Sequence, residues 1–186
     1  MAIIKRKKIV NVFQPTQAEL SEHDLLCRRA EKWLNQINCK VAIRDPFRAS
    51  TREQPDAIGW RDGVSILIEC KSSREDFLAD KQKPFRLDPT KGMGDWRFYL
   101  CPKDVIKEDD LPEGWGLLYS EGDRIRKISG YPPNTRWHNS PFLGNKADEN
   151  RMLVSALRRL TIRGHLPDIY KGIPIECPDC KHMDIG

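Results

Sequence analysis

The 186-residue sequence has no apolar run long enough to cross a membrane, no internal repeat and no low-complexity segment. The basic residues Lys5 to Lys8 are followed by only a short apolar patch, which is too small for the hydrophobic region of a signal peptide. These absences argue against membrane-spanning, solenoid and secreted classes of protein. We therefore expect a cytoplasmic protein that has no membrane partner.

A disulfide framework is missing as well. Six cysteines scattered through a chain without a secretion signal indicate reduced thiols or metal ligands. Cys177 and Cys180 form half of a zinc site, and His182 is close enough in sequence to be a third ligand, but the sequence contains no second Cys-x-x-Cys motif. A closed site of four ligands would need a further cysteine or histidine from this chain, or a second chain. Zn²⁺ binding at the tail and formation of a homodimer therefore both stay open.

Neither sign of charge dominates strongly. The chain has 32 Lys and Arg against 27 Asp and Glu, which gives a net charge of +5 and a pI near 8.9. With 32% charged and 39% hydrophobic residues, the composition is that of a soluble globular domain. The small basic excess favours an anionic partner such as nucleic acid. Residues 1–19 form a basic arm that either follows a phosphate backbone or is a solvated tail.

The most informative stretch runs from residue 55 to residue 71. Residues 64–71 alternate in the manner of a β-strand, which places Glu69 and Lys71 on the same face. Asp62-Gly63 predicts a tight hairpin before this strand, so residues 56–60 return antiparallel alongside it. The hairpin brings Asp56 close to Glu69. Two carboxylates and an ammonium group thus converge at one edge of the predicted sheet.

This combination of side chains suits divalent-metal chemistry. Mg²⁺ binds carboxylate oxygens, keeps several waters and accepts phosphate oxygens of a substrate as ligands. A bound ion lowers the pKa of a coordinated water, and a neighbouring lysine can orient that water and stabilise developing charge. The alternative is a solvated salt bridge worth about 0–1 kcal/mol. The hairpin and the serine-rich helix start after Lys71 favour the metal site.

Pro55-Asp56 and Glu69-Cys70-Lys71 resemble the motif of the PD-(D/E)XK nuclease superfamily. The run from Ser72 to Lys81, with its Ser-Ser, Asp-Phe and final Asp-Lys pairs, is similar to MmcB-like DNA-repair proteins and related phage proteins. The similarity covers about residues 20–160. It implies an α/β, restriction-endonuclease-like core in which a mixed central β-sheet is flanked by helices. One departure is Cys70, where the relatives carry Ile or Val, and its side chain is expected to point inward.

The resemblance also implies roles for the site residues. Asp56 and Glu69 would hold Mg²⁺ or Mn²⁺, with the backbone carbonyl of Cys70 as a further ligand. Lys71 would position the attacking water. The first helix of the superfamily often supplies another acid near its start, which favours Glu22 as a residue that reaches the ion through water. An ordinary helix-start glutamate is the alternative for Glu22.

The remaining patterns predict the elements around the site. Helices are expected over 21–36, 73–86 and 146–160, and further strands over 39–44, 96–102, 115–120 and 125–128. Helical spacing predicts three buried stripes: Leu26, Ala30, Trp33 and Ile37; then Phe77, Leu78, Lys81 and Phe85; then Leu153, Ala156, Leu157 and Leu160.

Four basic residues are candidates for contacts with a nucleic acid backbone. Arg48 and Arg52 lie on the predicted 45–54 loop, immediately before the Pro-Asp strand. Lys81 and Lys83 lie near the end of the predicted second helix. The alternatives are a plain connecting loop for the two arginines and complementation of the helix dipole for the two lysines.

The predicted organisation is a basic arm over 1–19, a nuclease-like domain over 20–165 and a tail with the Cys-x-x-Cys motif over 166–186. The predicted function is metal-dependent hydrolysis of phosphodiester bonds, with DNA as the favoured substrate and endonucleolytic cleavage as the favoured mode. The alternative is a catalytically inactive protein on the same scaffold that binds nucleic acid or inhibits a partner, because a fold alone does not assign a function. The sequence does not distinguish repair, phage replication and defence as the biological task.

Overall fold

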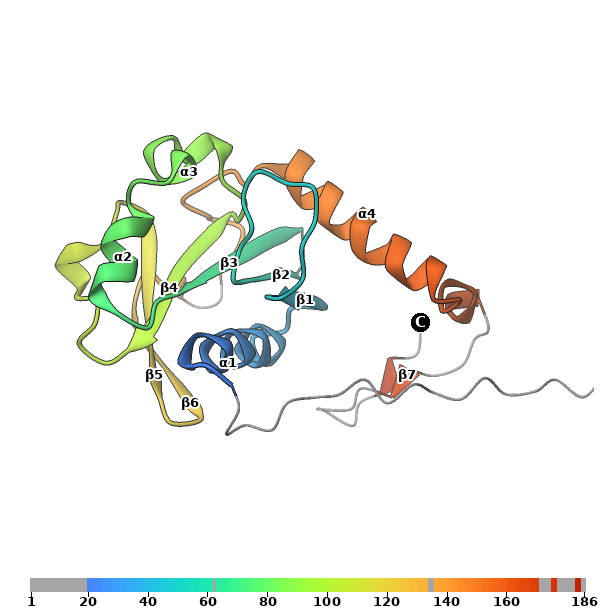
Figure 1. The fold of residues 1–186 in the computed structure, drawn as a ribbon, viewed down its shortest axis with the longest axis horizontal. Coiled ribbons are helices and arrows are strands. Elements are labelled where there is room, and N and C mark those ends of the chain that lie inside the picture. Colours follow the sequence, from blue (N-terminus) through green and yellow to red (C-terminus); the bar gives the residue numbers. More distant parts are fainter. Residues whose placement is uncertain (1–19, 62, 134–135, 171–174, 177–182, 185–186) are drawn as a thin grey trace, which may run out of the picture.

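The computed structural model describes residues 20–61, 63–133, 136–170, 175–176 and 183–184. Its centre is a six-stranded sheet in which the order of the strands in space is their order along the chain (Figure 1). The strands are β1 (Val41–Arg44), β2 (Ala57–Arg61), β3 (Val64–Cys70), β4 (Trp96–Pro102), β5 (Trp115–Glu121) and β6 (Arg124–Ser129). Every strand predicted within these residues is present, to within two residues at each end.

The sheet is mixed. β1, β2 and β3 pair antiparallel, β3, β4 and β5 pair parallel, and β5 and β6 pair antiparallel. The parallel step from β3 to β4 requires a crossover, which is made by α2 (Arg74–Asp80), α3 (Pro84–Leu87) and the 3₁₀ turn η2 (Pro89–Lys91). The expected α/β fold with a mixed central sheet flanked by helices is confirmed. The remaining short elements are η3 (Glu108–Asp110), η5 (Leu166–Tyr170), β7 (Ile175–Glu176) and β8 (Met183–Asp184).

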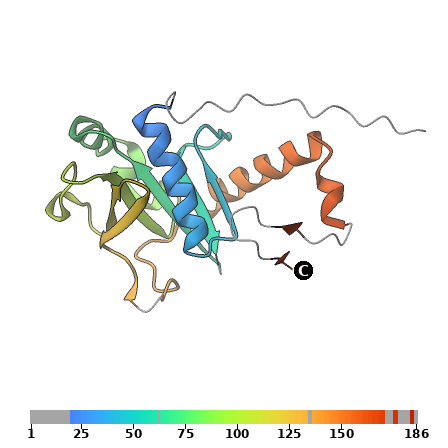
Figure 2. The same ribbon diagram turned by 90° about the horizontal axis from the view of Figure 1, so that it is seen from below.

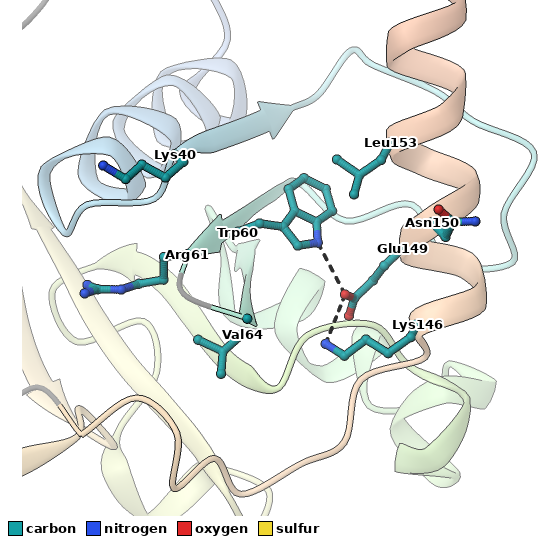
Figure 3. A pocket seen from close by; sticks show the side chains of 9 residues that line it. Lys40, Trp60, Arg61, Val64, Lys146, Glu149, Asn150 and Leu153 are labelled. Atoms are coloured by element: carbon teal, nitrogen blue, oxygen red, sulfur yellow. Dashed lines mark hydrogen bonds and ion pairs between the residues drawn. The ribbon is translucent and has the colours of Figure 1, made fainter. Parts of the chain in front are cut away.

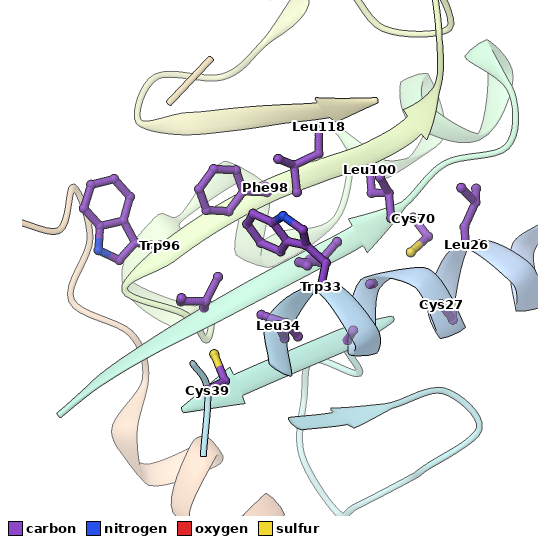
Figure 4. Close-up of a cluster of buried hydrophobic side chains, with 14 of the residues drawn as sticks. Leu26, Cys27, Trp33, Leu34, Cys39, Cys70, Trp96, Phe98, Leu100 and Leu118 are labelled. Carbon is purple, nitrogen blue, oxygen red and sulfur yellow. The ribbon is translucent and has the colours of Figure 1, made fainter. Parts of the chain in front are cut away.

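Helix α1 (Glu22–Gln36) covers one face of the sheet (Figure 2). Ser21 and Asp24 form a capping box, in which each side chain accepts a hydrogen bond from the other residue's backbone N–H. Leu26, Ala30 and Trp33 are buried, as their spacing predicts. They pack on a core built from the strands beneath the helix (Figure 4).

The alternation of β3 is also confirmed. Ile66 and Ile68 are fully buried and belong to the core under α1, together with Cys70. Leu67 belongs to a second core on the opposite face of the sheet. Glu69 therefore points away from α1 and toward the side of the sheet where the β3–β4 crossover lies.

The prediction of one helix over 73–86 is wrong. Ser73 is the expected N-cap, but α2 ends at Asp80, and a separate short helix begins at Pro84. Proline lacks the N–H that a helix interior requires and suits a first helical position, so the chain turns at Lys83, whose backbone is extended. The stripe expected on this helix is also wrong in part, because the Leu78 side chain is 48% exposed.

Helix α4 (Lys146–Ile162) begins on the body of the protein and then extends away from it (Figures 1 and 2). Its buried residues are Asp148, Glu149 and Met152, all in the first two turns. The expectation that Leu157 and Leu160 form a buried stripe is wrong, because their exposed fractions are 51% and 42%. None of the helices in the described part of the chain has the length and apolar character needed to span a membrane.

Candidate active site

The β2–β3 hairpin brings Asp56 to the end of β3. Ala57, the first residue of β2, pairs with Ile68, so the residue before β2 lies beside the last residues of β3. The backbone N–H of Cys70 donates a hydrogen bond of 2.8 Å to Asp56 Oδ2. The Cys70 side chain is fully buried under α1, as expected, while its backbone lies at the site.

Glu69 and Lys71 share the other face of the sheet, and their side chains meet. Lys71 Nζ lies 3.3 Å from Glu69 Oε2 and 3.3 Å from Asp80 Oδ1 of α2. The side chains of Glu69 and Lys71 are 1% and 4% exposed. Burial alone would lower the pKa of Lys71, but the charges of Glu69 and Asp80 outweigh burial and raise it. Lys71 is therefore a buried ammonium group held between carboxylates.

Asp56 is the unusual acid of the site. Burial, followed by the negative charge of Glu69, raises its pKa to about 7, and the positive charge of Lys71 opposes the shift only in part. Burial and repulsion from Glu69 thus outweigh the attraction of the nearby cations at Asp56. The three residues expected at the site are brought within electrostatic range of one another at one end of β3.

Three cations surround Glu69. Besides Lys71, Lys83 Nζ lies 3.5 Å from Oε2, and Arg86 Nη2 lies 3.1 Å from Oε1. Lys83 also pairs with Asp80 at 2.6 Å. The break before Pro84 produces this arrangement, because it turns Lys83 and Arg86 back over the end of α2. The sequence pattern suggested that Lys83 lies on a DNA-binding surface, and the structure places it against the acids of the site.

Arg86 links three buried acids. Its guanidinium is 2% exposed and lies 2.7 Å from Glu53 Oε1 and 2.7 Å from Asp80 Oδ2, in addition to its contact with Glu69. Tyr99 donates a further hydrogen bond of 2.9 Å to Asp80 Oδ2. Glu53 and Arg86 were not expected at the site. Arg86 reaches the site through the turn before Pro84, whereas the position of Glu53 depends on a chain path that no local pattern in the sequence encodes.

The residues present fit a divalent cation in one respect and oppose it in another. Glu69 Oε1 is buried and accepts no hydrogen bond from the described residues, since the nearby Arg86 Nη2 is poorly aligned with it. An unsatisfied carboxylate oxygen within electrostatic range of Asp56, whose pKa is raised, suits a hard cation such as Mg²⁺ or Mn²⁺. Against this, Lys83 and Arg86 already neutralise Glu69, so an ion would have to compete with them.

The first turn of α1 presents a histidine to the site. Glu22 lies on the exposed side of this turn. Its neighbour His23 has Nε2 at 3.5 Å from Asp56 Oδ1 and at 3.4 Å from the sulfur of Cys27. His23 was not predicted at the site, because the resemblance pointed to an acid on this helix. The signal in the sequence is the spacing of four between His23 and Cys27, which puts both on one helix face.

Cys27 is a buried thiol with unusual acidity. A hydrogen bond from the Cys70 thiol is the main cause that lowers the pKa of Cys27 to about 6, and His23 lowers it further. Burial raises the pKa of Cys70. The hydrogen bond with Cys27 is in turn the main cause that raises the pKa of His23 to about 9. The pKa shifts of the two thiols thus have opposite directions, with Cys27 as the more acidic member of the pair.

The other predicted site residues are spread more widely. Arg48 and Arg52 lie exposed on the loop before β2, and Arg48 pairs with Asp45. Lys81 Nζ lies 4.8 Å from the ring centre of Phe77. The basic arm over 1–19 and the predicted zinc ligands Cys177, Cys180 and His182 lie outside the described residues.

A separate pocket of about 410 Å³ lies at the opposite end of β3, near Val64 (Figure 3). Glu149 of α4 is buried beside it and accepts hydrogen bonds from Ser65 Oγ at 2.7 Å and Trp60 Nε1 at 3.3 Å. Lys146 Nζ lies 3.1 Å from the same carboxylate. This polar cluster fixes the start of α4 to the sheet. It lies apart from the acids at the C-terminal end of β3.

Comparison with known proteins gives one structural relative and no family. No protein-family model and no curated protein matches the chain. The chain is similar to a solved structure described as SPO1766, a protein of unknown function from Silicibacter pomeroyi, with a TM-score of 0.55 and 23% sequence identity. The match covers 78% of this chain and 93% of that one. At this level of identity the likeness shows a shared fold alone.

Proposed function

We propose that this protein is a metal-dependent nuclease that hydrolyses phosphodiester bonds, with DNA as its preferred substrate. The observation that carries the proposal is the placement of Asp56, Glu69 and Lys71 at one end of β3, where burial and Glu69 raise the pKa of Asp56 to about 7. A divalent cation bound by Asp56 and Glu69 would stabilise the ionised form of Asp56, and it would have to displace Lys83 or Arg86 from Glu69.

The roles of the side chains follow from their chemistry. Asp56 and Glu69 would hold Mg²⁺ or Mn²⁺, and the ion would supply Lewis-acid stabilisation of a phosphate oxygen. Lys71 is fixed as an ammonium group by Glu69 and Asp80, so it can donate a hydrogen bond to the attacking water or to a phosphate oxygen. Arg48 and Arg52, which lie exposed on the loop before β2, would contact the nucleic acid backbone.

A second candidate is a protein that binds nucleic acid without turnover. The observation in its favour is the burial of Glu69 and Lys71, together with the ion pairs from Lys83 and Arg86 that already satisfy most of the charge of Glu69. In such a protein the buried charges would stabilise the fold and specify its packing. The exposed basic residues would then provide the function.

Cleavage assays on the full chain separate the two candidates. Supercoiled plasmid and labelled oligonucleotides are incubated with the protein in Mg²⁺, in Mn²⁺ and in a chelator. We expect cleavage that Asp56→Ala and Lys71→Ala reduce by about 10²–10³-fold, in the range of other electrostatic contributors to catalysis. Arg74→Ala is the matched control, because it removes an exposed ion pair with Asp110 outside the site.

The outcomes differ clearly. Binding of DNA in a gel-shift assay without metal-dependent cleavage would favour the second candidate. Cleavage that survives in both site variants would show that the activity resides elsewhere or in a contaminant. Opening of the plasmid circle, as opposed to shortening of linear oligonucleotides from their ends, would establish endonucleolytic action.

A further inference from the structure

Three side chains with different ligand atoms converge where α1 meets the residue before β2. They are His23 and Cys27, one turn apart on the helix, and Asp56. The imidazole Nε2, the sulfur and one carboxylate oxygen all lie within 4.8 Å of one another. Imidazole, thiolate and carboxylate are the three ligand types that zinc takes from proteins.

The distances match those between ligands of one tetrahedral ion. Zinc bonds of about 2.0 Å to nitrogen or oxygen and about 2.3 Å to sulfur, at tetrahedral angles, separate the ligand atoms by roughly 3.3–3.6 Å. His23 Nε2 lies 3.4 Å from Cys27 Sγ and 3.5 Å from Asp56 Oδ1. Two of the three ligand separations therefore already have the length that such an ion requires.

The scaffold holds the three groups in place. A spacing of four on α1 puts His23 and Cys27 on the same face of the helix, and the capping box at Ser21 fixes the turn that carries the histidine. Asp56 Oδ2 is occupied by the hydrogen bond from the backbone N–H of Cys70. That bond leaves Oδ1 directed toward His23.

A cysteine–histidine catalytic pair explains this arrangement less well. In such a pair, one ring nitrogen faces the thiol and the other is oriented by the carboxylate. Here the sulfur and the carboxylate both approach Nε2, the same nitrogen. The Cys27 side chain is also buried, with an exposed fraction of 1%, so a substrate could not reach it. His23 Nε2, Cys27 Sγ and Asp56 Oδ1 surround one point, as the ligand atoms of a bound metal ion do.

We propose that His23, Cys27 and Asp56 bind Zn²⁺ through three protein ligands and leave a fourth position open on the side of the half-exposed imidazole. A thiolate and an imidazole select a borderline-soft ion over Mg²⁺, which prefers oxygen ligands. Three protein ligands with an open position are typical of zinc sites that bind water or a substrate group. The proposal shares Asp56 with the proposed nuclease site but does not depend on phosphodiester hydrolysis.

Cobalt provides a direct test, because Co²⁺ bound to a thiolate absorbs in the near ultraviolet. The full chain carries Cys177→Ser and Cys180→Ser, so that the tail thiols do not contribute, and is titrated with Co²⁺ in a non-thiol reductant. We expect a thiolate-to-cobalt band that saturates at one ion per chain and is bleached by Zn²⁺. In the same background, Cys101→Ser is the matched control, since it alters another buried thiol on β4 away from the cluster.

Two variants decide the assignment. Cys27→Ser removes the sulfur and should abolish the band. His23→Gln should weaken Co²⁺ binding by more than the roughly 10–100-fold that loss of an outer-sphere partner costs. His23 is 37% exposed, so this variant does not threaten the fold even if Cys27→Ser does.

Absence of the band in the background protein would overturn the proposal, as would a band unchanged by both variants. The readout is independent of cleavage. A band that behaves as expected in a protein without nuclease activity supports the zinc site and counts against the proposed function. Metal-dependent cleavage without the band supports the proposed function and overturns the zinc site.

Discussion

Replacement of Arg86 by methionine tests whether the buried charges of the site stabilise the protein. Met has a similar length and no charge, so Arg86→Met removes the guanidinium with little change in packing volume. Asp80 would keep Lys71 and Lys83, and Glu69 would keep the same two lysines. Glu53 would lose the ion pair with Arg86 and retain the backbone N–H of Met93 at 2.6 Å and the more distant charge of Arg97.

The expected loss of unfolding free energy in Arg86→Met follows from the ion pairs that each acid keeps. Glu53 is 1% exposed, so solvent screens it little, and an uncompensated buried charge costs about 3–5 kcal/mol of unfolding free energy. The control is Arg74→Met, which breaks the more exposed pair with Asp110 and should cost at most about 1 kcal/mol. In the double variant Glu53→Gln/Arg86→Met, both charges are gone, and most of the loss should be recovered.

The dependence on pH gives a second check. Burial raises the pKa of Glu53 above its unfolded value even with Arg86 present. Ionised Glu53 therefore costs stability in full above its folded pKa, and the cost shrinks as the pH falls below that value and disappears below the unfolded pKa. Without Arg86 the folded pKa rises further, so the deficit of Arg86→Met should be smaller at about pH 5 than at about pH 8.

Urea unfolding followed by circular dichroism at both pH values measures these differences. A loss at neutral pH no larger than that of Arg74→Met would refute the reasoning. So would a deficit that grows as the pH falls, because it would mean that Glu53 is not the group left uncompensated.

Three further predictions concern single positions and are checked by the same unfolding assay. Asp56→Asn should raise the unfolding free energy at pH values above about 7, where the buried carboxylate is ionised. The gain should vanish below the ordinary pKa of an aspartate, about 4. A gain that does not change with pH would contradict the raised pKa of Asp56. Gly94→Ala should destabilise more than Gly63→Ala, because both glycines have positive φ but only at Gly94 would the new Cβ meet Leu67, at 2.6 Å; equal losses would contradict this. Ser21→Ala should cost about 1 kcal/mol through loss of the cap, while Ser21→Gly should cost less.

Periodicity in the sequence was sufficient to predict which side chains are buried where one strand or helix packs against one other element. The alternation of residues 64–70 identified β3 and the face of each side chain, because a strand with one face under a helix repeats every two residues. The stripe of α1 was predicted for the same reason. The stripe of α4 has the same pattern, but its second half meets the 45–54 loop through Arg159, which lies over the Phe47 ring and hydrogen-bonds to the Arg48 carbonyl, and Leu157 and Leu160 stay exposed. A periodic pattern shows which residues share a face and leaves open what covers that face.

The candidate site was predicted only where its residues are brought together by local strand pairing. The hairpin joins Asp56 to Glu69 and Lys71 through local pairing, which the Asp-Gly turn indicates. Arg86 reaches Glu69 only because the chain turns before Pro84. The apolar spacing of residues 77–85 predicts one continuous helix, whereas Pro84 indicates the turn. His23 was missed because the motif directs attention to acids, although a histidine and a cysteine four residues apart are visible in the sequence.

The attachment of α4 by its first two turns has a consequence for amide exchange. The amides near Met152 lie over buried side chains and exchange only when a large unit of structure opens. Beyond Leu153 most residues are exposed and Arg159 makes the contacts to Phe47 and Arg48, so opening of this part of the helix alone should suffice to release those protons. Deuterium uptake should therefore rise in a gradient along this one helix, from rates typical of the core to rates typical of an isolated peptide.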